Sequence, residues 1–163
     1  MKKITLIRHA KSSWKDPDLS DHERPLNRRG IRSINLMGRR LSVRCFIPQY
    51  MISSPARRAL DTALGLIEAA GLNRNILVVD PMLYLAGEKK LIERIRLLDA
   101  KWDWVALVGH NPGLTEVAER LSGRTIRNVP TCGIVEMHFD VDDWRKTGSE
   151  EPVSFDFDFP KNR

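Results

Sequence analysis

Short apolar segments alternate with longer amphipathic ones along most of the chain, and this alternation restricts the fold more than any other feature of the sequence. Each apolar segment has the length of a buried strand, and a stretch with apolar residues at helical spacing follows it. The expected strands are 2–7, 49–53, 75–80 and 104–108, and the expected helices are 27–41, 54–70, 88–98 and 111–121. Such alternation is typical of a largely parallel sheet with helices on both faces.

Local signals mark where several of these helices begin and end. Asn27 is a candidate N-cap, and Ser54-Pro55 would supply an N-cap and a first-turn proline to the second helix. Gly71 and Gly123 follow the last apolar residues of two helices, where a left-handed residue commonly ends a helix. These signals support four separate helices.

Near the C-terminus, apolar and polar residues alternate over 135–139 and 153–159. Two further strands are therefore expected, each with one wetter face and lying toward the sheet edges. The complete pattern predicts an α/β three-layer sandwich with a mostly parallel central sheet of about six strands. We expect residues 1–163 to form a single domain, because no linker or internal repeat interrupts the pattern.

Composition limits the environment and the partners. No apolar run approaches the roughly 20 residues of a membrane span, and the N-terminus lacks the features of a secretory signal. We therefore expect a cytoplasmic protein without membrane contact. The formal net charge of +6 favours an anionic partner, which could be phosphate, nucleic acid or an acidic protein surface.

The cysteines and histidines give no indication of a metal site. Cys45 and Cys132 are far apart and form no Cys-x-x-Cys pair, so neither a disulfide framework nor a zinc site is predicted. The chain has no His-x-x-x-His pair among its four histidines. We expect no metal and no cofactor.

Cationic residues follow three of the four predicted parallel strands. Arg8 and His9 end the first strand, Arg57 lies in the first turn after the second, and His110 follows the fourth. Ligands of open α/β sheets bind outside the carboxyl ends of the strands, and helix N-termini there attract phosphate. The sequence therefore predicts a phosphate pocket formed by two imidazoles, two guanidiniums and helix ends, in which phosphate or sulfate would bind.

Four motifs carry a resemblance to a known family. They read LIRHAKSSW, RPLNRRG, ISSPARRALDTA and VGHNPG, in that order, and extend over most of the chain to about Gly123. In them the sequence resembles the histidine phosphatase superfamily, which includes the phosphoglycerate mutases, and within it the small SixA-type phosphohistidine phosphatases. Ala10 departs from the Arg-His-Gly that is more common in the superfamily, in a way associated with the small phosphatase branch.

The resemblance implies a role for each matching residue. His9 would be the nucleophile that forms a covalent phosphohistidine, and Arg8, Arg57 and His110 would surround the transferring phosphoryl group. Arg24 is a further expected substrate contact. Forked guanidiniums and a protonated His110 would stabilise the transition state, so the reaction would be independent of metal.

A general acid is harder to find in the sequence. Glu88 is the leading candidate, although a glutamate at the start of a helix is also explained by the helix dipole, and Asp18 and Asp21 are weaker candidates. Only residues 81–87 separate the third strand from its helix, whereas the small-molecule members of the family have a helical insertion there that covers the pocket. The resemblance therefore implies an open pocket, which suits a protein-borne phosphate. Because an imidazole leaves more readily than an alkoxide, these features favour a protein phosphohistidine as substrate.

Three alternative functions stay open. The enzyme could act on small phosphomonoesters, or the chain could be a phosphoprotein-binding module that does not need His9. Nucleic acid is the weakest alternative, because no aromatic platforms are interleaved with the arginines of the first helix. Those arginines are Arg28, Arg29, Arg32, Arg39, Arg40 and the nearby Arg44.

Overall fold

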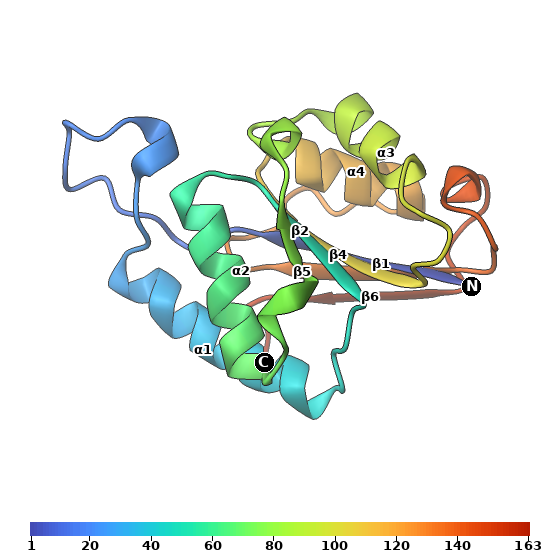
Figure 1. Ribbon diagram of the computed structural model, residues 1–163, viewed down its shortest axis with the longest axis horizontal. Coiled ribbons are helices and arrows are strands. Elements are labelled where there is room, and N and C mark those ends of the chain that lie inside the picture. The colour runs from blue at the N-terminus through green and yellow to red at the C-terminus, as the bar shows by residue number, and fades with distance from the viewer.

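The computed structural model describes residues 1–163, which form a six-stranded sheet between two layers of helices (Figure 1). The strands are β1 (Lys2–Arg8), β2 (Tyr50–Ser53), β3 (Leu77–Val79), β4 (Trp104–Gly109), β5 (Ile134–Phe139) and β6 (Ser154–Asp158). The α-helices are α1 (Arg28–Val43), α2 (Arg57–Ala70), α3 (Glu88–Arg96) and α4 (Gly113–Ser122). The predicted α/β three-layer sandwich is confirmed.

The sheet has the strand order β3-β2-β4-β1-β5-β6. β1, β2, β3 and β4 are parallel to one another, and β5 runs antiparallel to both β1 and β6. The sheet is therefore mixed but mostly parallel, as predicted. The two alternating C-terminal strands lie together at one side of it, and only β6 forms the edge.

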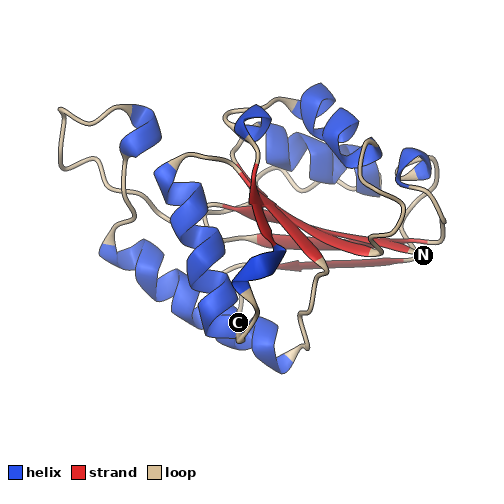
Figure 2. Ribbon diagram, in the orientation of Figure 1, coloured by secondary structure: helices blue, strands red, loops and turns tan.

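Apolar side chains are buried on both faces of the sheet. α1 and α2 cover one face, and α3 and α4 cover the other (Figure 2). Ile34 and Leu66 are buried on the first face, and Leu91 and Val117 on the second. Burial on both sides explains why the parallel strands read as continuous apolar runs. None of the helices combines the length and the apolar character that crossing a membrane requires.

Most of the predicted helix ends are confirmed. The side chain of Asn27 caps α1 by accepting a hydrogen bond of 2.9 Å from the N–H of Gly30. Gly71 (φ 72°) and Gly123 (φ 67°) end α2 and α4 in the left-handed conformation. Glycine adopts this conformation without a steric penalty, so the two positions end their helices sharply.

Two predicted boundaries are wrong. α2 begins at Arg57 with Ala56 as its N-cap, whereas Ser54 was expected as the N-cap and Pro55 in the first turn. The Ser54 hydroxyl does not cap the helix and lies 2.7 Å from Nε2 of His110. β3 spans only Leu77–Val79 and is partly exposed, whereas a buried strand over 75–80 was expected. Its position at the sheet edge leaves it partly uncovered, and residues Arg74–Ile76 form a 3-10 turn instead of extending the strand.

The segment between β1 and α1 projects beyond the carboxyl ends of the strands (Figure 1). A bridge between Ser12 and Leu26 closes its base, and its outer part contains a 3-10 turn, Asp21–Glu23. Gly30 lies directly against this base, where a Cβ would stand 2.3 Å from the carbonyl oxygen of Lys11. Glycine therefore allows α1 to begin in contact with the backbone that follows β1.

Candidate functional site

A cavity lies at the carboxyl ends of the parallel strands, where β1 ends at Arg8, β2 at Ser53 and β4 at Gly109. Its volume is about 250 Å³. The lining residues are Arg8, His9, Lys11, Ser12, Trp14, Arg24, Arg58, Leu85, His110, Asn111 and Thr131. Four of these are cations and none is a carboxylate, so the cavity suits a small anion.

His9 is held with one ring nitrogen free. The residue is only 8% exposed, and its Nδ1 lies 2.8 Å from the carbonyl oxygen of Ala10. A carbonyl oxygen only accepts, so Nδ1 carries the hydrogen and Nε2 keeps its lone pair. Burial, together with the nearby charges of Arg58 and Arg8, lowers the pKa of His9 to about 4. His9 is therefore a neutral imidazole at physiological pH.

His110 lies beside His9, with 5.2 Å between the ring centroids. Its Nε2 is 2.7 Å from the Ser54 hydroxyl, and its Nδ1 is 3.5 Å from a guanidinium nitrogen of Arg58. Burial, His9 and Arg58 lower the pKa of His110 to about 3. In the ligand-free site His110 is neutral, which differs from the protonated form expected from the sequence. A bound dianion would raise its pKa by opposing the surrounding positive charge.

The arginines of the cavity are held by hydrogen bonds to neighbouring groups. Arg8 donates to the carbonyl oxygen of Val129 at 2.9 Å, and Arg24 donates to the Ser12 hydroxyl at 2.8 Å. Arg58 is 2% exposed and donates to the Asp21 carboxylate at 3.0 Å. The Nε groups of Arg8 and Arg58 are buried without a hydrogen-bond partner. An unpaired buried donor costs about 1–3 kcal/mol, so these groups favour an anion.

Arg57 does not line the cavity, and its predicted place is taken by Arg58. The Arg57 side chain is 57% exposed, and its Nε lies 3.7 Å from a carboxylate oxygen of Asp61. Neighbouring helical residues point about 100° apart, so only one of two consecutive arginines in the first turn of α2 can face the cavity. The sequence prediction chose the wrong member of this pair.

A sequence model of the histidine phosphatase superfamily (branch 1) matches residues 4–81, which include Arg8, His9, Arg24 and Arg58. An uncharacterized protein of Mycobacterium tuberculosis is 31% identical over 138 residues, which cover 78% of this chain and 84% of that protein. The chain belongs to the histidine phosphatase superfamily.

Solved structures of this superfamily have the same fold. SixA from Agrobacterium tumefaciens superimposes with a TM-score of 0.78 at 24% identity, over 94% of this chain and 96% of that one. The protein histidine phosphatase SixA complexed with tungstate gives a TM-score of 0.80 at 20% identity, over 97% of both chains. The topology of this superfamily member is therefore that of the SixA structures.

Neither Glu88 nor Asp18 lines the cavity of this superfamily member. Glu88 begins α3 outside the cavity, with its nearest cation, Arg120, 4.0 Å away. The helix dipole favours a glutamate at the start of a helix, so the presence of Glu88 at this position is explained by helix stability and does not require a role in the cavity. Asp18 is exposed in the projecting segment and has no contact with the cavity lining.

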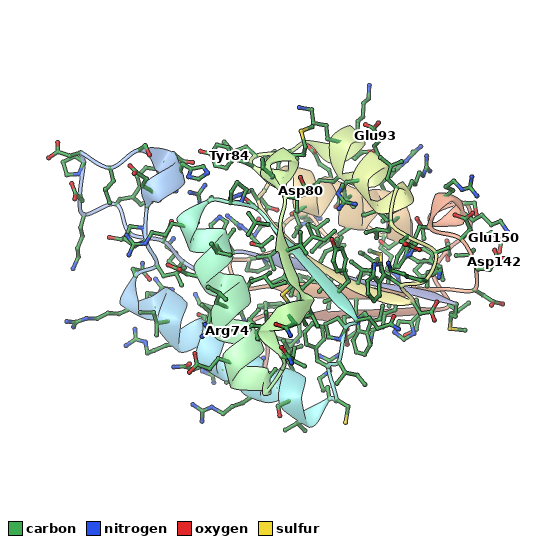
Figure 3. The ribbon with its side chains drawn as sticks, viewed as in Figure 1. Arg74, Asp80, Tyr84, Glu93, Asp142 and Glu150 are labelled. Atoms are coloured by element: carbon green, nitrogen blue, oxygen red, sulfur yellow. The ribbon has the colours of Figure 1, made fainter.

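Asp21 is a carboxylate that contacts two arginines of the cavity lining. It accepts hydrogen bonds from Arg24 and Arg58, and from the Tyr84 hydroxyl at 2.5 Å. Figure 3 shows the Tyr84 side chain beside the projecting segment that carries Asp21. Burial opposes ionisation, but the hydrogen bonds from Tyr84 and Arg58 outweigh it and lower the pKa of Asp21 to about 2. Asp21 is therefore ionised at neutral pH and cannot donate a proton there.

Several cavity residues were not identified from the sequence. Lys11, Ser12 and Trp14 belong to the first motif, and Asn111 belongs to the last, so the motifs already contained them. Thr131 comes from the connection before β5, which carries no recognisable pattern. No group of three or more His, Cys, Asp or Glu side chains is placed to hold a metal ion.

Proposed function

We propose that the protein is a phosphatase that removes phosphate from a protein phosphohistidine through a covalent intermediate on His9. The observation that carries this proposal is the cavity itself. It holds a neutral imidazole with a free Nε2 among four cations, and no carboxylic acid lines it. A neutral imidazole among cations suits attack on phosphorus. The lack of a carboxylic acid in the lining restricts the leaving group to one that can depart without receiving a proton.

In the first step, the Nε2 lone pair of His9 attacks phosphorus and forms a P–N bond while the bond to the leaving group breaks. The guanidiniums of Arg8 and Arg58 are placed to bind the equatorial oxygens, whose charge is spread over the transferring group. The hydrogen bond from Nδ1 to the Ala10 carbonyl stabilises the positive charge that His9 gains.

In the second step, water attacks phosphorus, the P–N bond to His9 breaks, and phosphate leaves with the neutral imidazole restored. The cations already neutralise the phosphoryl charge, which is the task a metal performs in other phosphatases. We therefore expect full activity in the presence of a chelator.

The leaving group decides the substrate class. An alkoxide must be protonated as it departs, and Asp21, the carboxylate that contacts the arginines of the cavity, is ionised and accepts their hydrogen bonds. The imidazole of a phosphohistidine leaves as a neutral ring when its other nitrogen carries a proton. A cavity without a general acid therefore favours phosphohistidine over alkyl phosphates.

Hydrolysis should consequently be faster for substrates whose leaving group departs readily without being protonated. With EDTA present, we expect kcat/KM for a phosphohistidine peptide to exceed that for an alkyl phosphate by about a hundredfold or more, the usual contribution of a general acid. Parallel phosphate-release assays on the two substrates measure this ratio. Glu88→Gln serves as a control and should change the phosphohistidine rate by less than about tenfold.

Equal rates on both substrates would contradict the proposal. If Glu88→Gln also removed the alkyl phosphatase activity by about a hundredfold, Glu88 would be the general acid and small phosphomonoesters the substrate class. Loss of all activity in EDTA with recovery on adding a divalent ion would contradict the metal-free mechanism.

The imidazoles should remain neutral far into the acid range. Burial and neighbouring cations disfavour the protonated ring, so in the free protein His9 should be half-protonated near pH 4 and His110 near pH 3. A saturating oxyanion such as tungstate should move both transitions to higher pH. NMR titration of the histidine side chains measures both transitions and their shift. A His9 transition near pH 6.5 in the free protein would refute the expectation that the buried imidazole resists protonation.

A further inference from the structure

A second, larger hollow adjoins the cavity and takes no part in the mechanism. It is a groove of about 470 Å³ and will be called the basic groove. Its lining residues are Lys11, Arg29, Arg32, Ser33, Leu36, Pro130, Thr131, Phe159, Pro160 and Lys161. Lys11 and Thr131 line both hollows, so the basic groove opens directly beside the site of phosphoryl transfer.

The charge of the basic groove has one sign. Its lining contains four cations, Lys11, Arg29, Arg32 and Lys161, and no carboxylate. None of the four forms an ion pair, whereas Arg40, which lies on α1 with Arg29 and Arg32, pairs with Asp158 at 2.9 Å. Four unpaired cations around one hollow leave a positive potential that an anionic ligand would offset.

The walls of the basic groove are held in place. Arg29, Arg32, Ser33 and Leu36 follow the spacing i, i+3, i+4, i+7, so α1 presents them on one face. The opposite wall belongs to the chain after β6, which Arg40 fixes to α1 by donating to the Phe159 carbonyl oxygen at 3.1 Å. In Figure 1 the C-terminus lies on the same side of the sheet as α1. The basic groove is therefore a formed surface.

We propose that the basic groove binds an acidic segment of the substrate protein that flanks the phosphorylated residue. This inference rests on the proposed function, because it assigns to that function a substrate whose phosphorylated residue lies in an acidic sequence. Bound in this way, the flanking carboxylates would meet the four cations while the phosphoryl group enters the cavity past Lys11. The basic groove would thus select among phosphorylated proteins.

The lining favours a peptide over other anions. Leu36 and Phe159 provide apolar surface between the cations, and Pro130 and Pro160 add more. An acidic peptide with interspersed apolar side chains matches this mixture, whereas a second phosphate group would contact cations alone. Single-stranded nucleic acid binds on successive aromatic platforms, and Phe159 is the one aromatic residue of the groove.

The test reverses charge on the α1 wall. Arg29→Glu/Arg32→Glu places acidic residues in the first turns of α1, where the helix dipole favours them, so the fold should persist. The matched control is Arg74→Glu/Arg96→Glu, which changes the net charge equally. Arg74, labelled in Figure 3, follows the end of α2 away from the cavity, and Arg96 ends α3. Both are exposed and outside either hollow.

Binding is measured by fluorescence anisotropy with an unphosphorylated labelled peptide rich in Glu and Leu. We expect Arg29→Glu/Arg32→Glu to raise its Kd by roughly tenfold and the control pair to raise it less than about threefold. A peptide of the same design with Lys in place of Glu should not bind measurably. Equal Kd values for the two charge-reversal variants would overturn the proposal, as would tighter binding of an oligothymidylate than of the acidic peptide.

A catalytic readout separates this inference from the proposed function. Arg29→Glu/Arg32→Glu should raise KM for a phosphohistidine peptide with Glu flanks by roughly tenfold and leave kcat within about twofold. Hydrolysis of a small aryl phosphate reports the cavity alone. If phosphohistidine peptides are hydrolysed with the same KM whatever their flanks, the basic groove inference fails and the proposed function stands. If the acidic peptide binds as expected but no phosphohistidine is hydrolysed, the proposed function fails.

Discussion

The His9→Ala variant should lose hydrolysis of phosphohistidine and of aryl phosphates together, by at least about a thousandfold. The reason is that Nε2 of His9 is the unpaired ring nitrogen in the cavity, oriented by the hydrogen bond from Nδ1 to the Ala10 carbonyl. Removing it removes the atom on which the phosphoryl group is carried. Initial rates on both substrates, measured at matched concentrations, give the loss for each reaction.

A binding control distinguishes loss of the nucleophile from loss of the fold. Because Arg8, Arg24 and Arg58 remain, His9→Ala should still be stabilised by tungstate in thermal unfolding. Rapid acid-free quenching of wild type with a labelled substrate should yield an alkali-stable phosphoenzyme that the variant lacks. A His9→Ala protein with a tenth or more of the wild-type rate would show that the phosphoryl group is not transferred to His9.

The fold could be predicted from the sequence because two regular patterns point to the same answer. Apolar runs such as 104–108 are continuous because the strand is covered on both faces, and Ile34 and Met37 recur at helical spacing because one side of α1 is buried. The exception is β3, where an apolar run lies at the sheet edge. Sequence pattern reports which residues are apolar, and tertiary position decides whether they are covered.

The residues of the site that could be predicted are those whose place is set by the end of a strand. Arg8 ends β1, His9 follows it and His110 follows β4, and these two strands are neighbours in the sheet, so the three side chains meet at its carboxyl edge. Thr131 could not be placed, because it reaches the cavity through a connection whose course depends on packing. Glu88 was misplaced because a glutamate that starts a helix and one that serves a cavity have the same sequence context.

The sequence also did not show which of the two arginines that begin α2, Arg57 or Arg58, faces the cavity. Substituting each of them in turn tests the assignment. We expect Arg58→Ala to lower kcat/KM by about a hundredfold to a thousandfold, the usual cost of losing one donor to transition-state charge. Arg57→Ala should change it by less than about twofold, because Arg57 is exposed and outside the cavity. Steady-state kinetics on a phosphohistidine peptide compare the matched pair.

Arg58 also contacts Asp21 and His110, so a purely structural role has to be separated from contact with the phosphoryl group. Arg58→Lys keeps the charge but loses the forked geometry, and it should recover only part of the lost kcat/KM. Inhibition by vanadate, an analogue of the transition state, should weaken in step with kcat/KM in the Arg58 variants and stay unchanged in Arg57→Ala. If Arg57→Ala were the damaging change, α2 would have to rotate on substrate binding so that Arg57 replaces Arg58 in the cavity. If both variants were active, the charge of Arg8 and Arg24 alone would suffice for phosphoryl transfer.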